Sequence, residues 1–369
     1  MKIIFAGGGT AGHINPALSI CEYIKAQEKD FSALFIGTER GLEKKLVPAK
    51  GYDIKYVDVR GINRKNLLKN ISVFAKLQKA KCDTVKLMKD FAPDAVVCTG
   101  GYVSGPVMMA AKKLGIPSLI HEQNVYPGFT VKGSQRFASF VAISFEETKE
   151  HLNCKEKCVV TGNPIREELL YTDKKLARQK LGLSDKPFVL VFGGSLGAAK
   201  INETMLGVLK LIKGHDIDIL FGTGDRNYDA VMQKIKEEGI KIPEGTKIVP
   251  YINNMSEVLA AADIVVSRAG AITVSEIAAL KKPSVLIPSP NVVRNHQEQN
   301  AREFERNGAA KVITENCLTS QLLYDTIKKM AEDKENLEKM SENAGKLAKT
   351  DALPKIYALV KEMVTTDIP

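Results

Sequence analysis

The chain has 369 residues, 44% of them hydrophobic, with 28 glycines, which is the composition of a globular protein long enough for two domains. It contains no run of about 18 apolar residues that could span a bilayer, and "MKIIFA" leads into glycines without the apolar region of a signal peptide, so we expect a cytoplasmic protein. The formal net charge of +10 predicts an anionic partner, which could be nucleic acid, a phosphorylated substrate or a membrane surface.

Short apolar runs alternate with helical segments along the whole chain, which is typical of parallel sheets with crossover helices. The first series of predicted strands covers residues 2–7, 32–38, 94–101, 117–124 and 140–144. A polar stretch, residues 162–187, separates it from a second series. That series covers residues 188–194, 217–224, 246–252, 263–270 and 283–289.

The two series open alike, with "IIFAGGGTAGH" in the first and "VLVFGGSLGAA" in the second. We therefore expect an α/β protein of two Rossmann-like, doubly wound domains that face each other across a cleft at the carboxyl ends of their strands. The predicted domains are residues 1–162 and residues 163–350. A last helix, about residues 351–369, is expected to return to the first domain.

Three glycine turns follow predicted strands: Gly7–Gly12, Gly100-Gly101 and Gly193–Gly197. Such a turn lets backbone N–H groups at a helix N-terminus approach an anion. A single turn of this kind could equally be a tight strand–helix connection. Three of them at strand ends favour the binding of diphosphates by both domains.

The first turn also matches the dinucleotide fingerprint Gly-x-Gly-x-x-Gly, and Glu39 could hold an adenine ribose. However, Glu39 comes later than the usual spacing of about 20 residues, and Arg40 lies beside it. His13 follows the glycines directly, where a dehydrogenase has an ordinary helical residue. A titratable side chain at this place is either a structural histidine or part of a different site.

Eight segments occur in an order that resembles the MurG family, the UDP-N-acetylglucosamine transferases of peptidoglycan synthesis. They are "GGGTAGHINPAL", "GGYVSGP", "HEQNVYPG", "GNPIR", "FGGSLGA", "PYINNM", "SRAGAITVSEIAAL" and "NHQEQNA". The resemblance implies the GT-B fold and transfer of N-acetylglucosamine from UDP-GlcNAc to the C4 hydroxyl of the N-acetylmuramic acid of lipid I, giving lipid II. Ala11 departs from the family, which usually has glycine there, and a methyl group is costly only if its φ is positive.

The resemblance places the donor mainly on the second domain. Ser195 would contact the UDP diphosphate, and Ile252 would bind uracil through its backbone. Glu276 would accept both ribose hydroxyls, although Thr273-x-x-Glu276 is also a capping box that could simply begin a helix. Gln297 would contact the sugar hydroxyls. Further donor contacts are implied at Thr10, Ala11, Gly12, Asn124, Arg166, Ala271, Ile272, Thr273, Val274 and Ser275.

An α-linked donor and a β-linked product imply one inverting displacement, which needs a base and a group that stabilises the departing UDP. His13 is the best candidate base, and Glu122 and His121 are alternatives that could simply shape their loop. Arg268 is the candidate charge partner for the leaving diphosphate. We expect no metal or other cofactor, with a helix N-terminus and Arg268 supplying the charge.

The acceptor, undecaprenyl-diphosphate-linked lipid I, is expected to bind through main-chain donors of Gly100, Gly101, Tyr102 and Ser104. Arginine and lysine recur between Asp58 and Asp83 without any acidic residue, and apolar residues recur there at helical spacing. Such a segment predicts docking on the anionic inner leaflet, although its apolar face could also be core. The expected membrane contacts are Lys69, Ile71, Phe74, Lys76 and Lys79.

These features predict a peripheral enzyme on the cytoplasmic face of the membrane, with other cell-wall synthesis proteins as further partners and no role for nucleic acid. A UDP-GlcNAc 2-epimerase, which shares the fold and the nucleotide, is the alternative, as is another GT-B transferase acting on a lipid. Cys154 and Cys158 are spaced C-x-x-x-C, but only His151 lies near them. We therefore expect free thiols rather than a zinc site.

Overall fold

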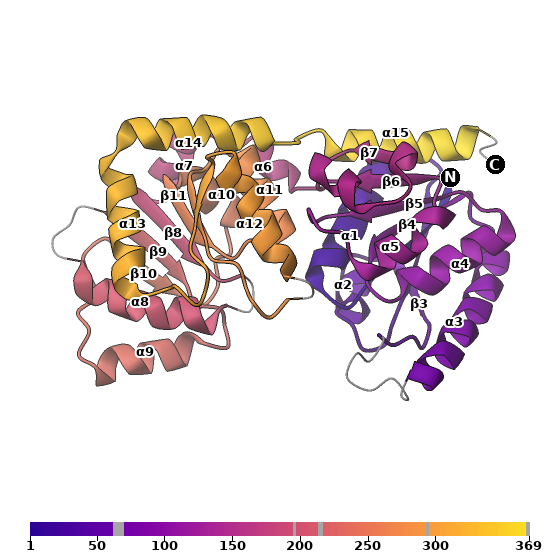
Figure 1. The fold of residues 1–369 in the computed structure, drawn as a ribbon, viewed down its shortest axis with the longest axis horizontal. Coiled ribbons are helices and arrows are strands. Elements are labelled where there is room, and N and C mark those ends of the chain that lie inside the picture. Colours follow the sequence, from indigo (N-terminus) through magenta and orange to yellow (C-terminus); the bar gives the residue numbers. More distant parts are fainter. Residues whose placement is uncertain (62–69, 195–196, 213–216, 293–294, 367–369) are drawn as a thin grey trace. The chain divides into compact units, whose positions relative to one another are not determined.

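The computed structural model describes residues 1–61, 70–194, 197–212, 217–292 and 295–366. The chain divides into two compact units (Figure 1). The first consists of Met1–Ile165 together with Asp351–Pro369, and the second of Arg166–Thr350. The boundary thus falls after Ile165 rather than after residue 162, and the last helix belongs to the first unit.

The first unit is built on a sheet of seven parallel strands. Because parallel strands are covered on both faces, they read as continuous apolar runs. In spatial order the strands are β3 (Asp53–Tyr56), β2 (Ser32–Gly37), β1 (Lys2–Gly7), β4 (Ala95–Gly100), β5 (Ser118–Glu122), β6 (Phe140–Ile143) and β7 (Cys158–Val160). The helices are α1 (Ala11–Gln27), α2 (Glu43–Ala49), α3 (Asn70–Phe91), α4 (Ser104–Leu114), α5 (Phe129–Ser134) and α15 (Ala352–Thr365).

Strand β1 shows how the two faces of this sheet are covered. Ile4 and Ala6 pack into a core with α3 and α4, which lie side by side (Figure 1). Ile3 and Phe5 point the other way, into a core with α1 and α15. Helix α15 contributes Ile356, Val360 and Met363 to that second core, because its apolar residues recur at helical spacing.

The second unit has a sheet of six parallel strands, with α8 and α13 packed together against it (Figure 1). The spatial order is β10 (Thr246–Val249), β9 (Asp218–Gly222), β8 (Phe188–Phe192), β11 (Ile264–Ser267), β12 (Ser284–Leu286) and β13 (Ala310–Val312). The helices are α6 (Glu167–Leu170), α7 (Lys174–Lys180), α8 (Ala199–Leu211), α9 (Tyr228–Glu237), α10 (Met255–Ala261), α11 (Ala271–Ala279), α12 (His296–Arg306), α13 (Ser320–Glu332) and α14 (Lys334–Leu347).

The sheets contain three strands that the sequence pattern did not predict: β3, β7 and β13. Each lies at the edge of its sheet. β3 alternates polar and apolar residues, and β7 and β13 have three residues each, so their hydrophobic signal is weak. No helix in the described part of the chain is both long and apolar enough to cross a membrane.

Both sheets reverse their strand order at the place where the predicted glycine loops occur. In the first sheet the reversal lies between β1 and β4, and in the second between β8 and β11. Open α/β sheets bind ligands beyond the carboxyl ends of strands at such a switch point. The topology therefore gives each unit one candidate ligand-binding edge.

Candidate active site

Two of the predicted glycine loops lie against each other in the first unit. The Gly8 N–H donates to the Gly100 carbonyl at 3.3 Å. Gly101 has a φ of +81°, and a Cβ at this position would lie 2.3 Å from the Gly8 oxygen. Only glycine allows this approach, so the close pairing of the loops explains why the second one begins with two glycines.

Helix α1 begins immediately beyond the first loop. Its N-cap residue, Thr10, is exposed and its side chain makes no capping hydrogen bond. Ala11 is the first helical residue, and positive φ among the described non-glycine residues is confined to Ala92, Lys281 and Asn295. The methyl group of Ala11 is therefore accommodated without backbone strain, and Gly12 leaves the helix N-terminus open.

The His13 imidazole lies in the first turn of α1, against the end of β4. Its Nδ1 is 3.1 Å from the Thr99 carbonyl oxygen and 3.3 Å from Gln123 Oε1. Both neighbours are acceptors, so Nδ1 carries the proton and Nε2 keeps its lone pair. A Cβ at Gly100 would lie 2.7 Å from Nδ1, so glycine is needed there. Burial lowers the pKa of His13, which keeps the ring neutral at physiological pH.

Glu43 was not predicted as a site residue, yet its carboxylate anchors the first glycine loop through a hydrogen bond. It is fully buried and accepts hydrogen bonds from the Gly9 N–H at 2.8 Å, the Thr38 N–H at 2.9 Å and the Thr38 hydroxyl at 2.8 Å. A Cβ at Gly8 would lie 2.6 Å from Glu43 Oε1. The only sequence signal that could have indicated Glu43 is its position just after the glycine-containing turn between β2 and α2.

We expect Glu43→Gln to lower the free energy of unfolding by about 1–3 kcal/mol, because an amide would place one N–H₂ group against backbone donors. The KM for the substrate should rise with it, since Gly9 precedes Thr10 and His13. Urea unfolding and steady-state kinetics measure the two effects. Glu22→Gln is the matched control, because Glu22 makes an exposed ion pair with Lys50 and its loss should change stability by less than about 1 kcal/mol.

Glu122 and Asn124 form the turn that follows β5. Glu122 is buried and accepts from the Asn124 N–H at 2.9 Å, the Asn124 amide at 3.1 Å and the Gly128 N–H at 2.7 Å. These contacts give the carboxylate a part in shaping the loop. Proton transfer by Glu122 and donor binding by Asn124 stay predictions.

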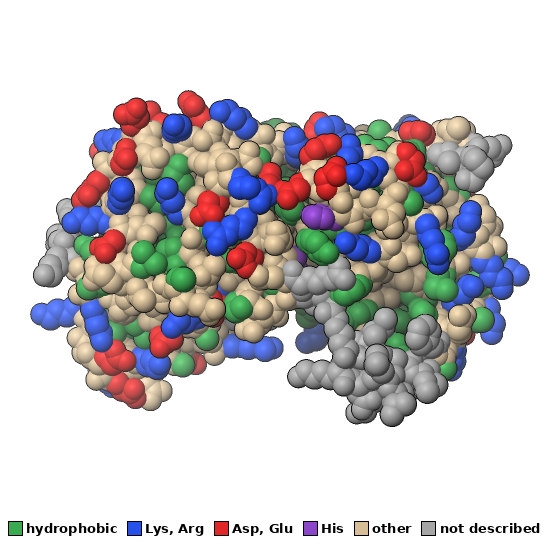
Figure 2. Space-filling model, in the orientation of Figure 1, with side chains coloured by type: hydrophobic (Ala, Val, Ile, Leu, Met, Phe, Trp, Pro, Cys, Tyr) green, Lys and Arg blue, Asp and Glu red, His purple; other side chains and the backbone are tan. Residues whose placement is uncertain are grey.

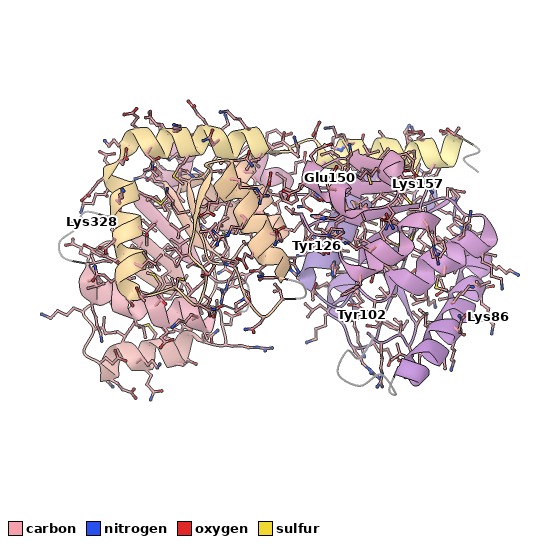
Figure 3. The ribbon with its side chains drawn as sticks, in the orientation of Figure 1. Lys86, Tyr102, Tyr126, Glu150, Lys157 and Lys328 are labelled. Carbon is pink, nitrogen blue, oxygen red and sulfur yellow. The ribbon has the colours of Figure 1, made fainter. Side chains whose placement is uncertain are left out.

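The second glycine loop presents Tyr102 outward and Ser104 inward. Tyr102 is 59% exposed and lies at the edge of the unit (Figure 3). Ser104 is buried, and its hydroxyl oxygen lies 2.8 Å from the Gly100 carbonyl oxygen and 3.1 Å from the Ala6 carbonyl oxygen, either of which can accept its proton. The Ser104 side chain therefore stabilises the loop itself, and binding of the acceptor diphosphate by this loop stays a prediction.

The third glycine loop connects β8 with α8 in the second unit. Gly197 has a φ of +73°, and a Cβ there would lie 2.0 Å from the Thr223 carbonyl oxygen. The N-cap residue of α8, Ala198, has no side chain that could cap the helix. Among the described residues, no side chain is recorded as a cap on α8, which leaves N–H groups at its N-terminus available to an anion. Ser195, the predicted diphosphate contact, lies outside the described residues.

Glu276 lies in α11 and is held by Arg166. Arg166 Nε is 2.9 Å from Oε1 and Nη2 is 3.1 Å from Oε2, so the ion pair is bidentate. Burial raises the pKa of Glu276, whereas the Arg166 guanidinium acts in the opposite direction. The alternative of a capping box is wrong, because α11 begins at Ala271 with Gly270 as its N-cap and Thr273 already lies inside the helix.

The first turns of α11, Ala271 to Ser275, follow the loop in which Arg268 lies. Arg268 donates to Glu315 at 2.9 Å and to the carbonyls of Ile287 and Pro288 at 3.1 and 3.3 Å. Its side chain is only 14% exposed. Arg268 therefore ties three segments of the second unit together, and its contact with a leaving diphosphate stays a prediction.

The two remaining predicted donor contacts are partly or fully buried. The Ile252 side chain is buried, and a Cβ at Gly222 would lie 2.8 Å from its Cδ1. Such burial anchors the loop after β10, and recognition of uracil by its backbone stays a prediction. Gln297, at the start of α12, accepts the Ser289 N–H at 2.9 Å.

The expected membrane segment is only partly described. Lys69 and the side chains of Ile71 and Phe74 lie outside the described residues. Farther along α3, Ala80, Thr84 and Met88 are buried, so this part of the apolar face is core. Lys76 pairs with Asp58, and Lys79 is exposed. On the face seen in Figure 2, the charged side chains on α3 and α4 are mostly those of lysine and arginine.

No group of His, Cys, Asp and Glu side chains suited to a metal occurs among the residues that the structure describes. Cys154 and Cys158 are free. Residues 216–218 have the Asp-x-Asp form, but Asp218 begins β9, at the end of the strand opposite to the ligand-binding edge, and accepts a hydrogen bond from Ser184.

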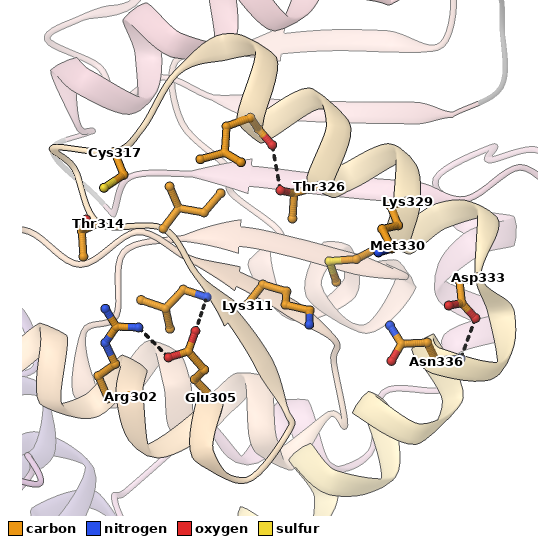
Figure 4. Close-up of a pocket in the computed structure, with 13 residues that line it drawn as sticks. Arg302, Glu305, Lys311, Thr314, Cys317, Thr326, Lys329, Met330, Asp333 and Asn336 are labelled. Atoms are coloured by element: carbon orange, nitrogen blue, oxygen red, sulfur yellow. Dashed lines mark hydrogen bonds and ion pairs between the residues drawn. The ribbon is translucent and has the colours of Figure 1, made fainter.

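A cavity of about 560 Å³ lies between β13, α12 and α13 of the second unit (Figure 4). Its lining mixes Lys311 and Lys329 with Asp333 and an Arg302–Glu305 ion pair. None of the predicted site residues lines it. The cavity is therefore separate from the loops at the switch point.

Comparisons with known proteins agree with this geometry. The model of the glycosyltransferase family 28 N-terminal domain matches residues 3–143, and that of the C-terminal domain matches residues 188–356. The UDP-N-acetylglucosamine--N-acetylmuramyl-(pentapeptide) pyrophosphoryl-undecaprenol N-acetylglucosamine transferase of Acetivibrio thermocellus is 48% identical over 369 residues, which cover 99% of this chain and 98% of the relative.

Among solved structures, Acinetobacter baumannii MurG matches with a TM-score of 0.80 at 28% identity, over 98% of this chain and 99% of the other. UDP-GlcNAc 2-epimerase from Neisseria meningitidis matches over 98% of this chain and 100% of the other with a TM-score of 0.66, but its 16% identity shows the fold alone. The two parallel-sheet units thus have the GT-B fold. The chain belongs to glycosyltransferase family 28 and, within it, to the MurG family of N-acetylglucosamine transferases.

Proposed function

We propose that the protein transfers N-acetylglucosamine from UDP-GlcNAc to the C4 hydroxyl of the N-acetylmuramic acid of lipid I, giving lipid II. The observation that carries the proposal is the environment of His13. Its Nδ1 is held by Thr99 and Gln123 at the switch point of the first sheet, and none of the hydrogen bonds within the described structure uses its Nε2. A neutral imidazole with a free lone pair suits general-base catalysis.

The reaction would be one inverting displacement. The acceptor oxygen attacks the anomeric carbon of the sugar, its proton passes to His13 Nε2, and the bond from the anomeric carbon to the diphosphate oxygen breaks as UDP leaves. The uncapped N-terminus of α8 would stabilise the departing charge without a metal ion. The paired glycine loops and Tyr102 would hold the acceptor diphosphate.

On the donor side, Glu276 would accept the two ribose hydroxyls. Both of its oxygens are bound to Arg166, so ribose binding would require Arg166 to release or share at least one of them. Arg166 could then turn toward the donor phosphates. Gln297 would bind the sugar hydroxyls, and the loop of Ile252 would bind uracil.

A transfer assay with radiolabelled UDP-GlcNAc and a short-chain lipid I analogue tests the proposal, with the labelled disaccharide product as the expected result. Incubation with UDP-GlcNAc alone distinguishes the epimerase, which would form the manno epimer without any acceptor. A protein that forms the epimer and no disaccharide would overturn the proposal.

The lipid acceptor implies a peripheral position on the inner leaflet, with residues 60–81, which include the first half of α3, as the docking segment. We expect Lys79→Glu to weaken binding to anionic liposomes by about 1–2 kcal/mol, or roughly 5- to 30-fold, because each lysine near such a surface contributes about 1 kcal/mol. The loss should be larger at low salt. Sedimentation with liposomes measures it.

Lys328→Glu is the matched control, since Lys328 lies on α13 of the second unit (Figure 3) and the change in charge is the same. Equal losses for the two variants would show that net charge, rather than α3, governs binding. Transfer to a water-soluble acceptor should be unaffected by Lys79→Glu. This result would separate docking from catalysis.

A further inference from the structure

A chain of hydrogen bonds leads from His13 into the interior of the first unit. Gln123 is buried, and its Oε1 faces His13 Nδ1 at 3.3 Å. Its Nε2 lies 2.9 Å from the Thr99 carbonyl oxygen and 2.9 Å from His121 Nδ1. The other nitrogen of His121, Nε2, is 2.9 Å from the Gly162 carbonyl oxygen. The proposed function uses Gln123 only as a neighbour of His13 Nδ1 and gives no role to His121.

The position of each proton in this hydrogen-bond chain follows from the Gly162 carbonyl, which is its end farthest from His13. The Gly162 carbonyl can only accept, so His121 carries its proton on Nε2 and its Nδ1 is an acceptor. That acceptor requires the N–H₂ group of Gln123, so the Gln123 oxygen must face His13. An oxygen at this place requires the proton of His13 to be on Nδ1, and the Thr99 carbonyl imposes the same requirement.

This hydrogen-bond chain is also rigid. His121 is fully buried on β5, and Thr99 is fully buried on β4. The backbone carbonyl of Gln123 accepts from Asn163 at 3.0 Å. A reversed amide would set the Gln123 oxygen against the Thr99 carbonyl and against His121 Nδ1, three acceptors with no proton between them. The structure thus admits one arrangement of the protons.

We propose that Gln123 and His121 are positioning residues for the transferase reaction, which hold His13 in the tautomer whose Nε2 can accept the proton of the acceptor hydroxyl. This inference rests on the proposed function, in which His13 is the base. It makes a specific statement about the resting protein: His13 and His121 are neutral and carry their protons on opposite nitrogens.

Nitrogen-15 NMR of the full-length protein labelled at histidine tests this statement without any assay. The chain has five histidines, and His13→Gln and His121→Gln variants assign the two signals. We expect His13 to be protonated on Nδ1 and His121 on Nε2. A spectrum in which His13 is protonated on Nε2 would overturn the inference.

Two substitutions of Gln123 test the role in catalysis. Gln123→Glu places a carboxylate where His13 Nδ1 is now 3.3 Å from an amide oxygen, so the acidic limb of the kcat–pH profile should move upward by about 1–3 pH units. Gln123→Met removes the contact, and we expect kcat to fall about tenfold with an unchanged KM, because Thr99 still holds Nδ1. Among the described residues, Glu43 of α2 is a further charged group that acts on His13, and it is the same in both variants.

Gln135→Met is the matched control. Gln135 is also a buried glutamine of the first unit, but its amide contacts Lys132, Asn153 and Cys154 rather than His13. It should lower the melting temperature without moving the pH limb or the His13 signals. If Gln123→Glu likewise left the limb unmoved, Gln123 would be a structural residue only.

Failure of the proposed function would give a different set of results from failure of the positioning role. If His13→Gln kept full activity while the NMR spectrum showed the expected tautomers, His13 would not be the base, although the hydrogen-bond chain would be as described. If the tautomers were wrong but His13→Gln abolished transfer, the base would stand and the positioning role would fall.

Discussion

His13→Ala is expected to lower kcat by about 10²–10⁴, the contribution typical of a positioned general base. His13 lies beside the paired glycine loops, and its only hydrogen bonds within the described structure involve Nδ1 and the backbone. Loss of the imidazole therefore removes a proton acceptor with little change in the core. The KM for UDP-GlcNAc should change much less. Steady-state kinetics with a lipid I analogue measure both constants.

The pH profile adds a second test of His13. Burial lowers its pKa, so the neutral form should persist below the ordinary histidine value of about 6.5, and kcat should decline only under more acidic conditions. In His13→Ala this limb should disappear. His151→Ala is the control, because His151 lies in the same unit but packs against Tyr126. A decrease of only a few-fold in His13→Ala would assign the base to Glu122 or to solvent.

Glu276→Ala is expected to raise the KM for UDP-GlcNAc by roughly 5- to 150-fold, equivalent to about 1–3 kcal/mol for the lost ribose hydrogen bonds. The stability cost should be small, because the Arg166 side chain is 43% exposed and can be solvated by water. Kinetics over a range of donor concentrations and the melting temperature separate the two effects.

Glu276→Gln is the conservative comparison for the donor site. An amide keeps one acceptor oxygen but cannot form the bidentate pair with Arg166, so an intermediate KM is expected. Should both variants lower only the melting temperature and leave the KM unchanged, Glu276 would be a partner for Arg166 and not a ribose ligand.

The fold was largely predictable from the sequence, because parallel strands buried on both faces are continuous apolar runs. The central strands, such as β1 and β8, stand out for this reason, and so do the glycine turns that follow them. The edge strands β3, β7 and β13 did not stand out, because they are half-exposed or only three residues long. A hydrophobic pattern reports burial, and edge strands are less buried than central strands, so their pattern is weak.

The candidate site was predictable as a set of motifs, but not as a set of contacts. The sequence by itself determined the glycine loops at the strand ends, because local backbone geometry requires glycine there. It also showed that His13 follows the first of these loops directly and that Glu276 lies in the segment after the strand β11. Only the tertiary structure placed Glu43 beneath the first loop and paired Arg166 with Glu276, because these partners are 34 and 110 residues apart. The tertiary structure alone also decided which nitrogen of His13 is free. The Gly162 carbonyl acts on His13 through the side chains of His121 and Gln123, and proton positions depend on such distant partners.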